Sequence, residues 1–312
     1  MRLRWYLYKM NLGYACINTQ LGKKKILGGR TCRKATFQQN GLRYVGDLAL
    51  QNLRDIYTIS MWNVANDIHF YRMPSDIFPW QSEYELEDLP QYKEILQVCE
   101  SIGKFATANN LRLTFHPGPF NILASSKPDV VKRTMKELRQ HSQLFDMMGF
   151  EPSHYNKINI HIGAAYKDKY AVLAKWCENY KLLDSHTKKR LTIENDDKKS
   201  LYTISDLHTY VHSEVGIPLV MDFHHHNCHS GDMSAMDSFR LARDTWGDIR
   251  PVVHYSSSRR LHEDAGAKEQ AHADYIYDEI PYEVLETADV MLEAKAKEKA
   301  VLQYREKVSI LV

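Results

Sequence analysis

The sequence lacks the features of secreted and membrane-spanning proteins. No stretch approaches the ~20 consecutive apolar residues that a membrane helix requires. The five cysteines are widely spaced and form no Cys-x-x-Cys pair, a pattern typical of free thiols in a reducing compartment. Residues 1–13 hold no apolar segment long enough for a signal peptide. We therefore expect an intracellular protein without membrane contact, located in the cytoplasm or nucleoid, or in the nucleus of a eukaryote.

Neither sign of charge dominates the chain. Its 41 Lys and Arg residues nearly balance 39 Asp and Glu residues, so any surface that binds a polyanion must be local. No linker rich in Pro, Gly or Ser, no internal repeat and no charged block divides the sequence. A chain of 312 residues that is 44% hydrophobic can bury a large core, and α/β barrels often form one domain of about 250 residues. We expect a single domain over residues 1–312.

Short β-branched or aromatic runs that end in polar or charged residues recur along the chain, separated by segments with helical spacing. One such segment, residues 128–149, has apolar side chains on one face, Pro128 just inside its start and Gly149 just past its end. Residues 170–180 and 234–246 show weaker versions of the same period. Strand alternating with helix predicts an α/β fold, a single TIM (β/α)8 barrel. The eight predicted strand runs are residues 11–18, 67–76, 112–118, 157–165, 190–197, 218–225, 250–258 and 289–298.

The segment between the first strand run and the following helical pattern is rich in Lys, Gly and Gln. We interpret residues 19–44 as one long first loop. Its basic residues are predicted to contact phosphates at the barrel mouth, and they are Lys23, Lys24, Lys25 and Arg30.

Ionisable side chains follow the predicted strands, as in PLVMDFHHHNCH (218–229). The C-terminal ends of barrel strands form one mouth, so these side chains are expected to converge there. Histidines and carboxylates without thiolates suit manganese, zinc, iron or magnesium, and paired ions can convert bound water to hydroxide for phosphodiester hydrolysis. The strand-end candidates are Asp76, His116, His161, Glu194, Asp222 with His225, His254 and Glu293.

Each candidate also has a structural interpretation. A strand-end histidine such as His116 is often hydrogen-bonded rather than a ligand, and residues 224–226 could form a solvated loop. Glu194 and Glu293 could be buried carboxylates paired with lysines. What favours a metal site is that five successive predicted strands, the fourth to the eighth, each end with at least one candidate.

A set of motifs in one order resembles the UV-damage endonucleases over nearly the whole chain, from about residue 12 to about residue 300. Together FYRMPSDIFP, HIG, ENDD and MLEAK make the resemblance specific. The motifs are LGYACIN (12–18), FYRMPSDIFP (70–79), TFHPG (114–118), INIHIG (158–163), LTIENDD (191–197), VMDFHHH (220–226), HYSSS (254–258), HADY (272–275) and MLEAKAKEKA (291–300).

The resemblance implies a monomeric TIM-barrel enzyme that nicks double-stranded DNA 5′ to cyclobutane pyrimidine dimers, 6-4 photoproducts and other lesions, abasic sites among them. It implies two or three manganese ions as cofactors, with zinc, cobalt or magnesium as alternatives. Catalytic roles around the water-activating ion fall to Glu194, Asp222, His254 and Glu293. The implied metal ligands are these four with His116, His161, His225 and His272.

Several positions concern DNA or depart from the family pattern. Tyr14 and Asn18 match positions near the damaged strand, although Tyr14 could equally be a packing residue of the barrel. Where the family usually has Gln followed by Tyr or Phe as a lesion probe, this chain has Pro119 and Phe120. Phe120 can still wedge and stack, whereas Pro119 has no side-chain hydrogen-bonding group.

Two further departures affect the metal site. Val252 stands where the family often has a lysine, so a carboxylated lysine cannot form at that position. Glu83 aligns with a further family histidine and could ligate through oxygen or lie on the surface.

Two rival functions remain open from the sequence. One is a sugar isomerase or epimerase of the related xylose-isomerase-like barrels, in which a metal polarises a carbonyl and a His or Glu moves a proton. The other is a DNA-binding relative that has lost catalysis through Val252. The wedge pair and Lys23–Lys25 favour DNA over a compact sugar.

Overall fold

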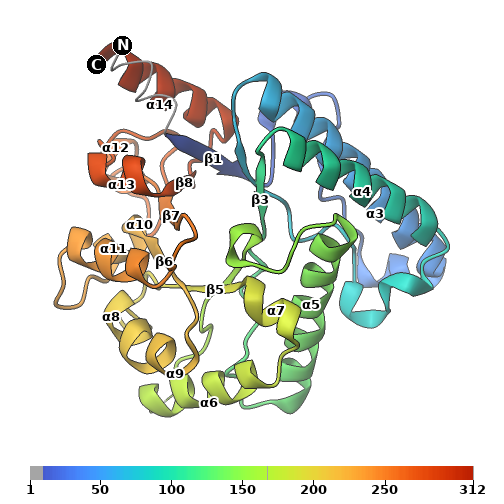
Figure 1. The fold of residues 1–312 in the computed structure, drawn as a ribbon, viewed down its shortest axis with the longest axis horizontal. Coiled ribbons are helices and arrows are strands. Elements are labelled where there is room, and N and C mark those ends of the chain that lie inside the picture. Colours follow the sequence, from blue (N-terminus) through green and yellow to red (C-terminus); the bar gives the residue numbers. More distant parts are fainter. Residues whose placement is uncertain (1–9, 167, 312) are drawn as a thin grey trace.

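The computed structural model describes residues 10–166 and 168–311, so most of the N-terminal segment used to judge a signal peptide lies outside the described residues. Parallel strands form a central ring, and helices surround it (Figure 1). The strands are β1 (Asn11–Ala15), β2 (Phe70–Arg72), β3 (Arg112–Thr114), β4 (Ile158–Ile160), β5 (Leu191–Glu194), β6 (Leu219–Asp222), β7 (Val252–Tyr255) and β8 (Asp289–Leu292).

The sheet has eight strands in the order β3-β2-β1-β8-β7-β6-β5-β4, and its neighbouring strands are parallel. A parallel bridge between Phe115 and Ile158 joins the two ends, so the barrel is nearly closed. The predicted TIM barrel is confirmed, and each of the eight predicted runs contains one strand. The strands are shorter than the runs, because each run continues into the loop that leaves its C-terminal end.

Helices follow the strands and cover the barrel on its outside. The α-helices are α2 (Thr19–Gly22), α3 (Lys34–Ala65), α4 (Tyr92–Ala108), α5 (Pro128–Met147), α6 (Lys169–Lys181), α7 (Ser185–Arg190), α8 (Ile204–Leu207), α9 (Ser213–Val215), α10 (Phe223–Cys228), α11 (Ala235–Asp244), α12 (Arg259–His262), α13 (Tyr282–Thr287) and α14 (Glu298–Leu311). Shorter 3-10 turns cover Gln81–Glu83, Leu86–Asp88 and His154–Asn156, and a π-turn covers His208–His212. Within the described residues, no helix is long and apolar enough to cross a membrane.

The predicted helix over residues 128–149 is α5. It has Pro128 in its first turn, and it ends before Gly149, whose φ is 79°. The predicted patterns at 170–180 and 234–246 are α6 and α11. The prediction of one loop over 19–44 is wrong at both ends, because α2 begins at Thr19 and α3 begins at Lys34.

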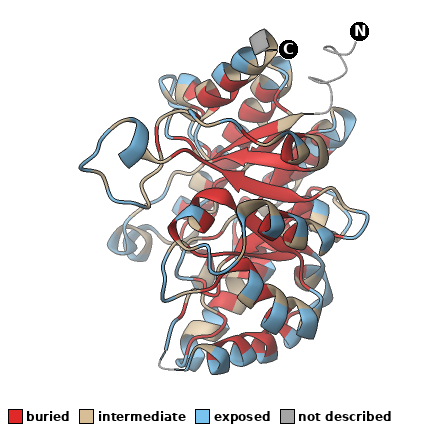
Figure 2. Ribbon diagram, turned by 90° about the vertical axis from the view of Figure 1, so that its left-hand side faces the viewer, coloured by how far each residue is buried: buried red, intermediate tan, exposed pale blue. Residues whose placement is uncertain are grey.

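Strand side chains alternate between the barrel interior and the surrounding helices, and the strands are buried except at Asn11 and Arg72 (Figure 2). Gly13 brings β1 close to β2, because a Cβ there would collide with the carbonyl oxygen and ring of Phe70. One small apolar cluster contains residues from five strands, namely Ala15, Phe70, Val220, Val252 and Met291, with Trp246 packed beside them. On these five strands the apolar layer lies between the two polar ends of the barrel.

Candidate metal centre

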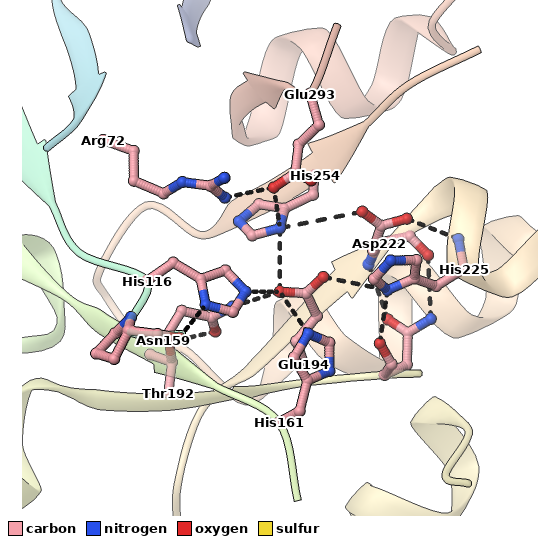
Figure 3. Close-up of polar contacts among 12 residues, drawn as sticks. Arg72, His116, Asn159, His161, Thr192, Glu194, Asp222, His225, His254 and Glu293 are labelled. Atoms are coloured by element: carbon pink, nitrogen blue, oxygen red, sulfur yellow. Dashed lines mark hydrogen bonds and ion pairs between the residues drawn. The ribbon is translucent and has the colours of Figure 1, made fainter. Parts of the chain in front are cut away.

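Glu194, the last residue of β5, lies at the centre of a polar cluster at the C-terminal ends of the strands (Figure 3). Its Oε2 atom is 3.1 Å from Nε2 of His116 and 3.1 Å from Nδ1 of His254. Its Oε1 atom is 3.3 Å from Nδ1 of His225, and Nε2 of His161 lies 3.9 Å from Oε2. Histidines from four different strands or following loops therefore point toward one buried carboxylate.

Two further carboxylates approach the same histidine, His254, from other strands. Oε1 of Glu293 is 3.2 Å from His254 Nδ1, and Oδ2 of Asp222 is 4.0 Å from it. Among the described residues, neither His254 ring nitrogen has a partner at hydrogen-bond geometry, nor has the buried Oδ2 of Asp222. Three carboxylates thus surround one imidazole that can neutralise at most one of them.

A second set of side chains holds the cluster in place. Asn159 donates to Glu194 Oε2 and accepts from Thr192 Oγ1 at 2.8 Å. Oδ1 of Asp196 is 3.1 Å from Nδ1 of His161, which leaves His161 Nε2 directed at Glu194. Asp222 is fixed through its backbone by the side chain of Asn195. Carboxylates and amides in such positions set the orientation and tautomer of metal-binding histidines.

Burial and mutual attraction perturb the titration of these groups. Burial alone raises the pKa of Glu194, but His254 and His161 outweigh it and hold that pKa well below its usual range. Burial lowers the pKa of His116 to about 4 despite the neighbouring Glu194. For His161 burial also acts downward, yet Glu194 and Asp196 raise its pKa to about 9. An entering cation would have to displace the His161 proton, as metal binding to histidine generally does.

The donor set fits divalent cations. Two groups of three residues offer ligand atoms within 4.8 Å of one another in the described part of the chain, and both include Glu194. One adds His116 and His161, and the other adds Asp222 and His254. Nitrogen and oxygen donors without thiolates suit manganese, zinc or magnesium, and a shared carboxylate can bridge two ions. The orphaned oxygen of Asp222 and nitrogens of His254 are the atoms that such ions would satisfy.

Two cations of the site were not found from the sequence. Arg72, at the end of β2, forms an ion pair with Glu293 (Figure 3). The sequence predicts Asp76 at that strand end, but β2 ends four residues earlier and Asp76 lies exposed in the following loop. Lys157 is fully buried, and its Nζ has no hydrogen-bond partner in the part of the chain that the structure describes. Burial lowers the pKa of Lys157 well below its usual range, against the attraction of Glu194. The apolar pattern that predicts a strand does not indicate that a neighbouring basic residue, here Arg72 or Lys157, belongs to the site.

His272 lies at the edge of the cluster. Its ring centroid is 6.5 Å from that of His225 and 5.2 Å from that of His224.

Glu83, in contrast, has a 42% exposed side chain that pairs with Lys34 at 3.5 Å. Glu83 therefore sits in the surface position that the sequence left as its alternative, and we do not retain it as a candidate ligand. Val252 lies in the apolar layer, two residues before His254 on β7.

The positions expected to touch the damaged strand differ in exposure. Tyr14 and Asn18 have no exposed surface. The Tyr14 hydroxyl donates to Asn63 of α3 and accepts from Asn18. The role of these two residues near the damaged strand stays a prediction, and the Tyr14 side chain packs toward α3 rather than in a layer of the barrel interior. Phe120, by contrast, is 87% exposed in the loop after β3. Next to it, Pro119 is also exposed.

A cavity of about 290 Å³ lies beside Pro119 and reaches His161 and His225. Lys23, Lys24 and Lys25 are exposed after α2, as a phosphate-binding segment requires. Arg30 is not free in the same way, because its guanidinium pairs with Asp55 and with the Lys25 carbonyl. The phosphate contact of Arg30 stays a prediction, for a guanidinium that already has these two partners.

An eight-stranded parallel barrel with a cluster of histidines and carboxylates at its C-terminal mouth defines a TIM-barrel protein with a candidate metal centre. Within that class the sequence decides the family. The family described as UV-endonuclease UvdE matches residues 10–311, and the chain belongs to it. The predicted family is thereby confirmed, and with it the class of phosphodiester hydrolases to which endonucleases belong.

Named relatives agree with this assignment. A UV-damage endonuclease of Schizosaccharomyces pombe is 35% identical over 95% of this chain, which spans about half (50%) of that relative's length. A UV DNA damage endonuclease of Bacillus thuringiensis is 33% identical over 84% of this chain and 82% of its own.

Solved structures extend the comparison to the fold. The crystal structure of SacUVDE superposes with a TM-score of 0.83 at 30% identity, covering 97% of this chain and 99% of that one. Endonuclease IV from Thermus thermophilus shares only the fold, with a TM-score of 0.51 at 11% identity over 82% and 91% of the two chains. Family membership leaves the sugar-isomerase alternative without support.

Proposed function

We propose that this protein is a metal-dependent DNA repair endonuclease that nicks double-stranded DNA 5′ to cyclobutane pyrimidine dimers and 6-4 photoproducts, with abasic sites as further substrates. The observation that carries the proposal is the convergence of Glu194, Asp222 and Glu293 on His254 at the barrel mouth. Such a concentration of buried negative charge is costly unless cations bind it. Membership of the UV-endonuclease family supplies the reaction class.

The residues that would hold two or three manganese ions are His116, His161, Glu194, Asp222, His225, His254, His272 and Glu293. Bound ions of this kind activate water and neutralise charge on a phosphoryl group. The chain's own contribution is orientation. Asn159 and Thr192 fix the Glu194 carboxylate, and Asp196 directs Nε2 of His161 inward.

The loops around the mouth would engage the DNA. Phe120 presents an apolar ring that could fill the space left by an extruded lesion. Lys23, Lys24 and Lys25 would lie against the phosphates. The cavity beside Pro119, which borders both His161 and Phe120's loop, is large enough to take part of an extruded nucleotide.

Relaxation of UV-irradiated supercoiled plasmid tests the proposal. We expect purified protein with manganese to convert irradiated plasmid to the nicked circle, to spare unirradiated plasmid, and to lose activity with chelator. Metal analysis of the same preparation separates the rivals. Bound metal without nicking would favour a different metal-dependent reaction, whereas DNA binding with neither metal nor nicking would identify a non-catalytic relative.

A further inference from the structure

Arg72, Arg112 and Arg190 differ in how many of their N–H groups are paired within the protein, and only Arg112 and Arg190 are fully buried. Arg112 makes four hydrogen bonds at the opposite end of the barrel, to the Tyr155, His154 and Arg250 carbonyls and to Asp289. A planar guanidinium offers five N–H groups, and a buried structural arginine normally has most of them paired.

Arg190 is satisfied in the same way. It makes four hydrogen bonds, to the carbonyl and hydroxyl of Ser142, to Asp146 and to the Phe150 carbonyl. Arg112 and Arg190 are therefore structural cations with four hydrogen bonds each, although the Nε of Arg190 lacks a partner among the described residues.

Arg72 does not follow this pattern. Among the described residues its one hydrogen-bond partner is Glu293, through Nη1, and its buried Nε has none. Its side chain keeps 14% of its surface exposed at the mouth. The guanidinium therefore has one paired N–H group, directed at Glu293 (Figure 3).

The surroundings of Arg72 indicate which ligand its unpaired N–H groups could bind. Its partner oxygen, Glu293 Oε1, is 3.2 Å from His254 Nδ1, which is itself 3.1 Å from Glu194. The surrounding protein acceptors are carboxylates that the cations of the proposed function would engage. The unpaired N–H groups of Arg72 would therefore bind an oxyanion from outside the protein. A planar guanidinium group can donate to two oxygens of one phosphate.

We propose that Arg72 is a catalytic residue that binds a non-bridging oxygen of the scissile phosphodiester, with Glu293 holding its guanidinium in position; this inference rests on the proposed function. Arg72 transfers no proton, because an arginine stays charged throughout. Its contribution is a fixed positive charge beside a phosphorus centre that gains negative charge during attack. A role limited to neutralising Glu293 is the competing explanation.

The test compares Arg72→Lys and Arg72→Met with wild type in single-turnover incision of a duplex containing one cyclobutane dimer. Lysine keeps a cation for Glu293 but loses the planar fork. We expect both variants to incise about 10²- to 10³-fold more slowly, the usual loss for one transition-state donor. Arg190→Lys serves as the control, because it disturbs a buried arginine away from the mouth, so its melting temperature should fall with its incision rate unchanged.

Bound manganese, measured by electron paramagnetic resonance, separates the two explanations. We expect the Arg72 variants to bind as much manganese as wild type. Wild-type incision by Arg72→Lys, or loss of incision in step with a loss of manganese, would overturn the assignment, since Arg72 would then act only through Glu293.

A second readout does not depend on nicking. Inorganic phosphate should raise the melting temperature of the manganese-loaded protein, and Arg72→Met should need at least about tenfold more phosphate for the same rise, as expected for loss of a charged hydrogen bond. Equal phosphate dependence in both proteins would overturn the assignment. If wild type binds phosphate through Arg72 but nicks no DNA, the proposed function fails while the anion site stands.

Discussion

Both ends of this barrel carry carboxylates, and the two ends differ in how many protein cations those carboxylates have as partners. At the end of the barrel opposite the mouth, here called the closed end, Asp289 is the first residue of β8 and accepts from Arg112 and Arg250 at 2.8 Å each, so the protein neutralises its charge. At the mouth Glu293, directly after the same strand, shares its surroundings with Glu194 and Asp222. The two carboxylates are four residues apart, about 13 Å along a strand. At the closed end one carboxylate has two arginine partners, whereas at the mouth three carboxylates share Arg72 and several histidines.

The contrast separates stability from activity. Groups whose partners are all in the protein contribute to folding, and their loss should affect the free energy of unfolding. Groups that converge without sufficient partners place like charges together, which opposes folding and is retained where a ligand binds. Substitutions at the mouth should therefore reduce incision more than stability, and substitutions at the closed end should reduce stability more than incision.

The largest effect is expected at the mouth. Glu194→Gln or Glu293→Gln should abolish incision, because each removes a charge that helps to hold an ion, while the fold stays intact. Incision assays, metal content and thermal melts of the purified variants measure this. Glu178→Gln on the exposed face of α6 is the matched control and should leave activity unchanged. Normal incision by either mouth variant would remove that residue from the site.

The closed end should show the reverse. Arg112→Met leaves Asp289 buried with only the half-exposed Arg250 as partner, so the free energy of unfolding should fall by about 3–5 kcal/mol. The incision rate per folded molecule should stay near wild type, because Arg112 lies below the apolar layer. Urea unfolding gives the first quantity and active-site titration with incision gives the second. A specific loss of catalysis without loss of stability would contradict the division between the two ends.

The sequence predicted the barrel and most of the cluster for one physical reason. Buried parallel strands read as short apolar runs, and ionisable residues directly after them must meet at the mouth, as Glu194, Asp222 and His254 do. The fuller ligand set came from resemblance to a family rather than from spacing. The assignment of catalytic and ligand roles, and of one domain over residues 1–312, remains a prediction.

Other features depended on contacts that no local pattern encodes. The end of β2 is set by pairing with β3, which makes Arg72 rather than Asp76 the strand-end side chain. The start of α3 looked like a loop because of its polar residues and Gly41, yet Phe37 packs against Tyr84 at a centroid distance of 6.1 Å. Alternation could not say which face of β1 met the helices, so the outward direction of Tyr14 was missed.

Discrimination between damaged and intact DNA should change less than catalysis at the mouth. Phe120→Ala removes an exposed ring that could stack where a lesion is extruded, so the preference for damaged duplex should fall by on the order of 1–3 kcal/mol, the worth of one aromatic-base stack. Pro119→Gln should do little harm and sharpen lesion choice by adding a polar probe. Incision kinetics on duplexes with a dimer, an abasic site or no damage measure both. Leu182→Ala, 73% exposed after α6, is the matched control, and an unchanged ratio in Phe120→Ala would make that residue a bystander.

The smallest effect is expected from the basic segment after α2, whose lysines would bind phosphates without reading the lesion. Replacing Lys23, Lys24 and Lys25 with Gln should weaken binding to damaged and undamaged duplex alike, with lesion preference unchanged. Removing one lysine–phosphate ion pair should reduce the slope of log affinity against log salt by about 0.9, so the slope of the triple variant should fall by up to about 3. Fluorescence anisotropy across a salt series gives the slope. Gln substitutions at Lys181, Lys188 and Lys189, around the start of β5 at the closed end, change the net charge equally and should leave the slope unaltered. Equal slopes for the triple variant and wild type would mean that the DNA crosses the mouth elsewhere, whereas equal reductions in both triple variants would mean that net charge alone attracts the DNA.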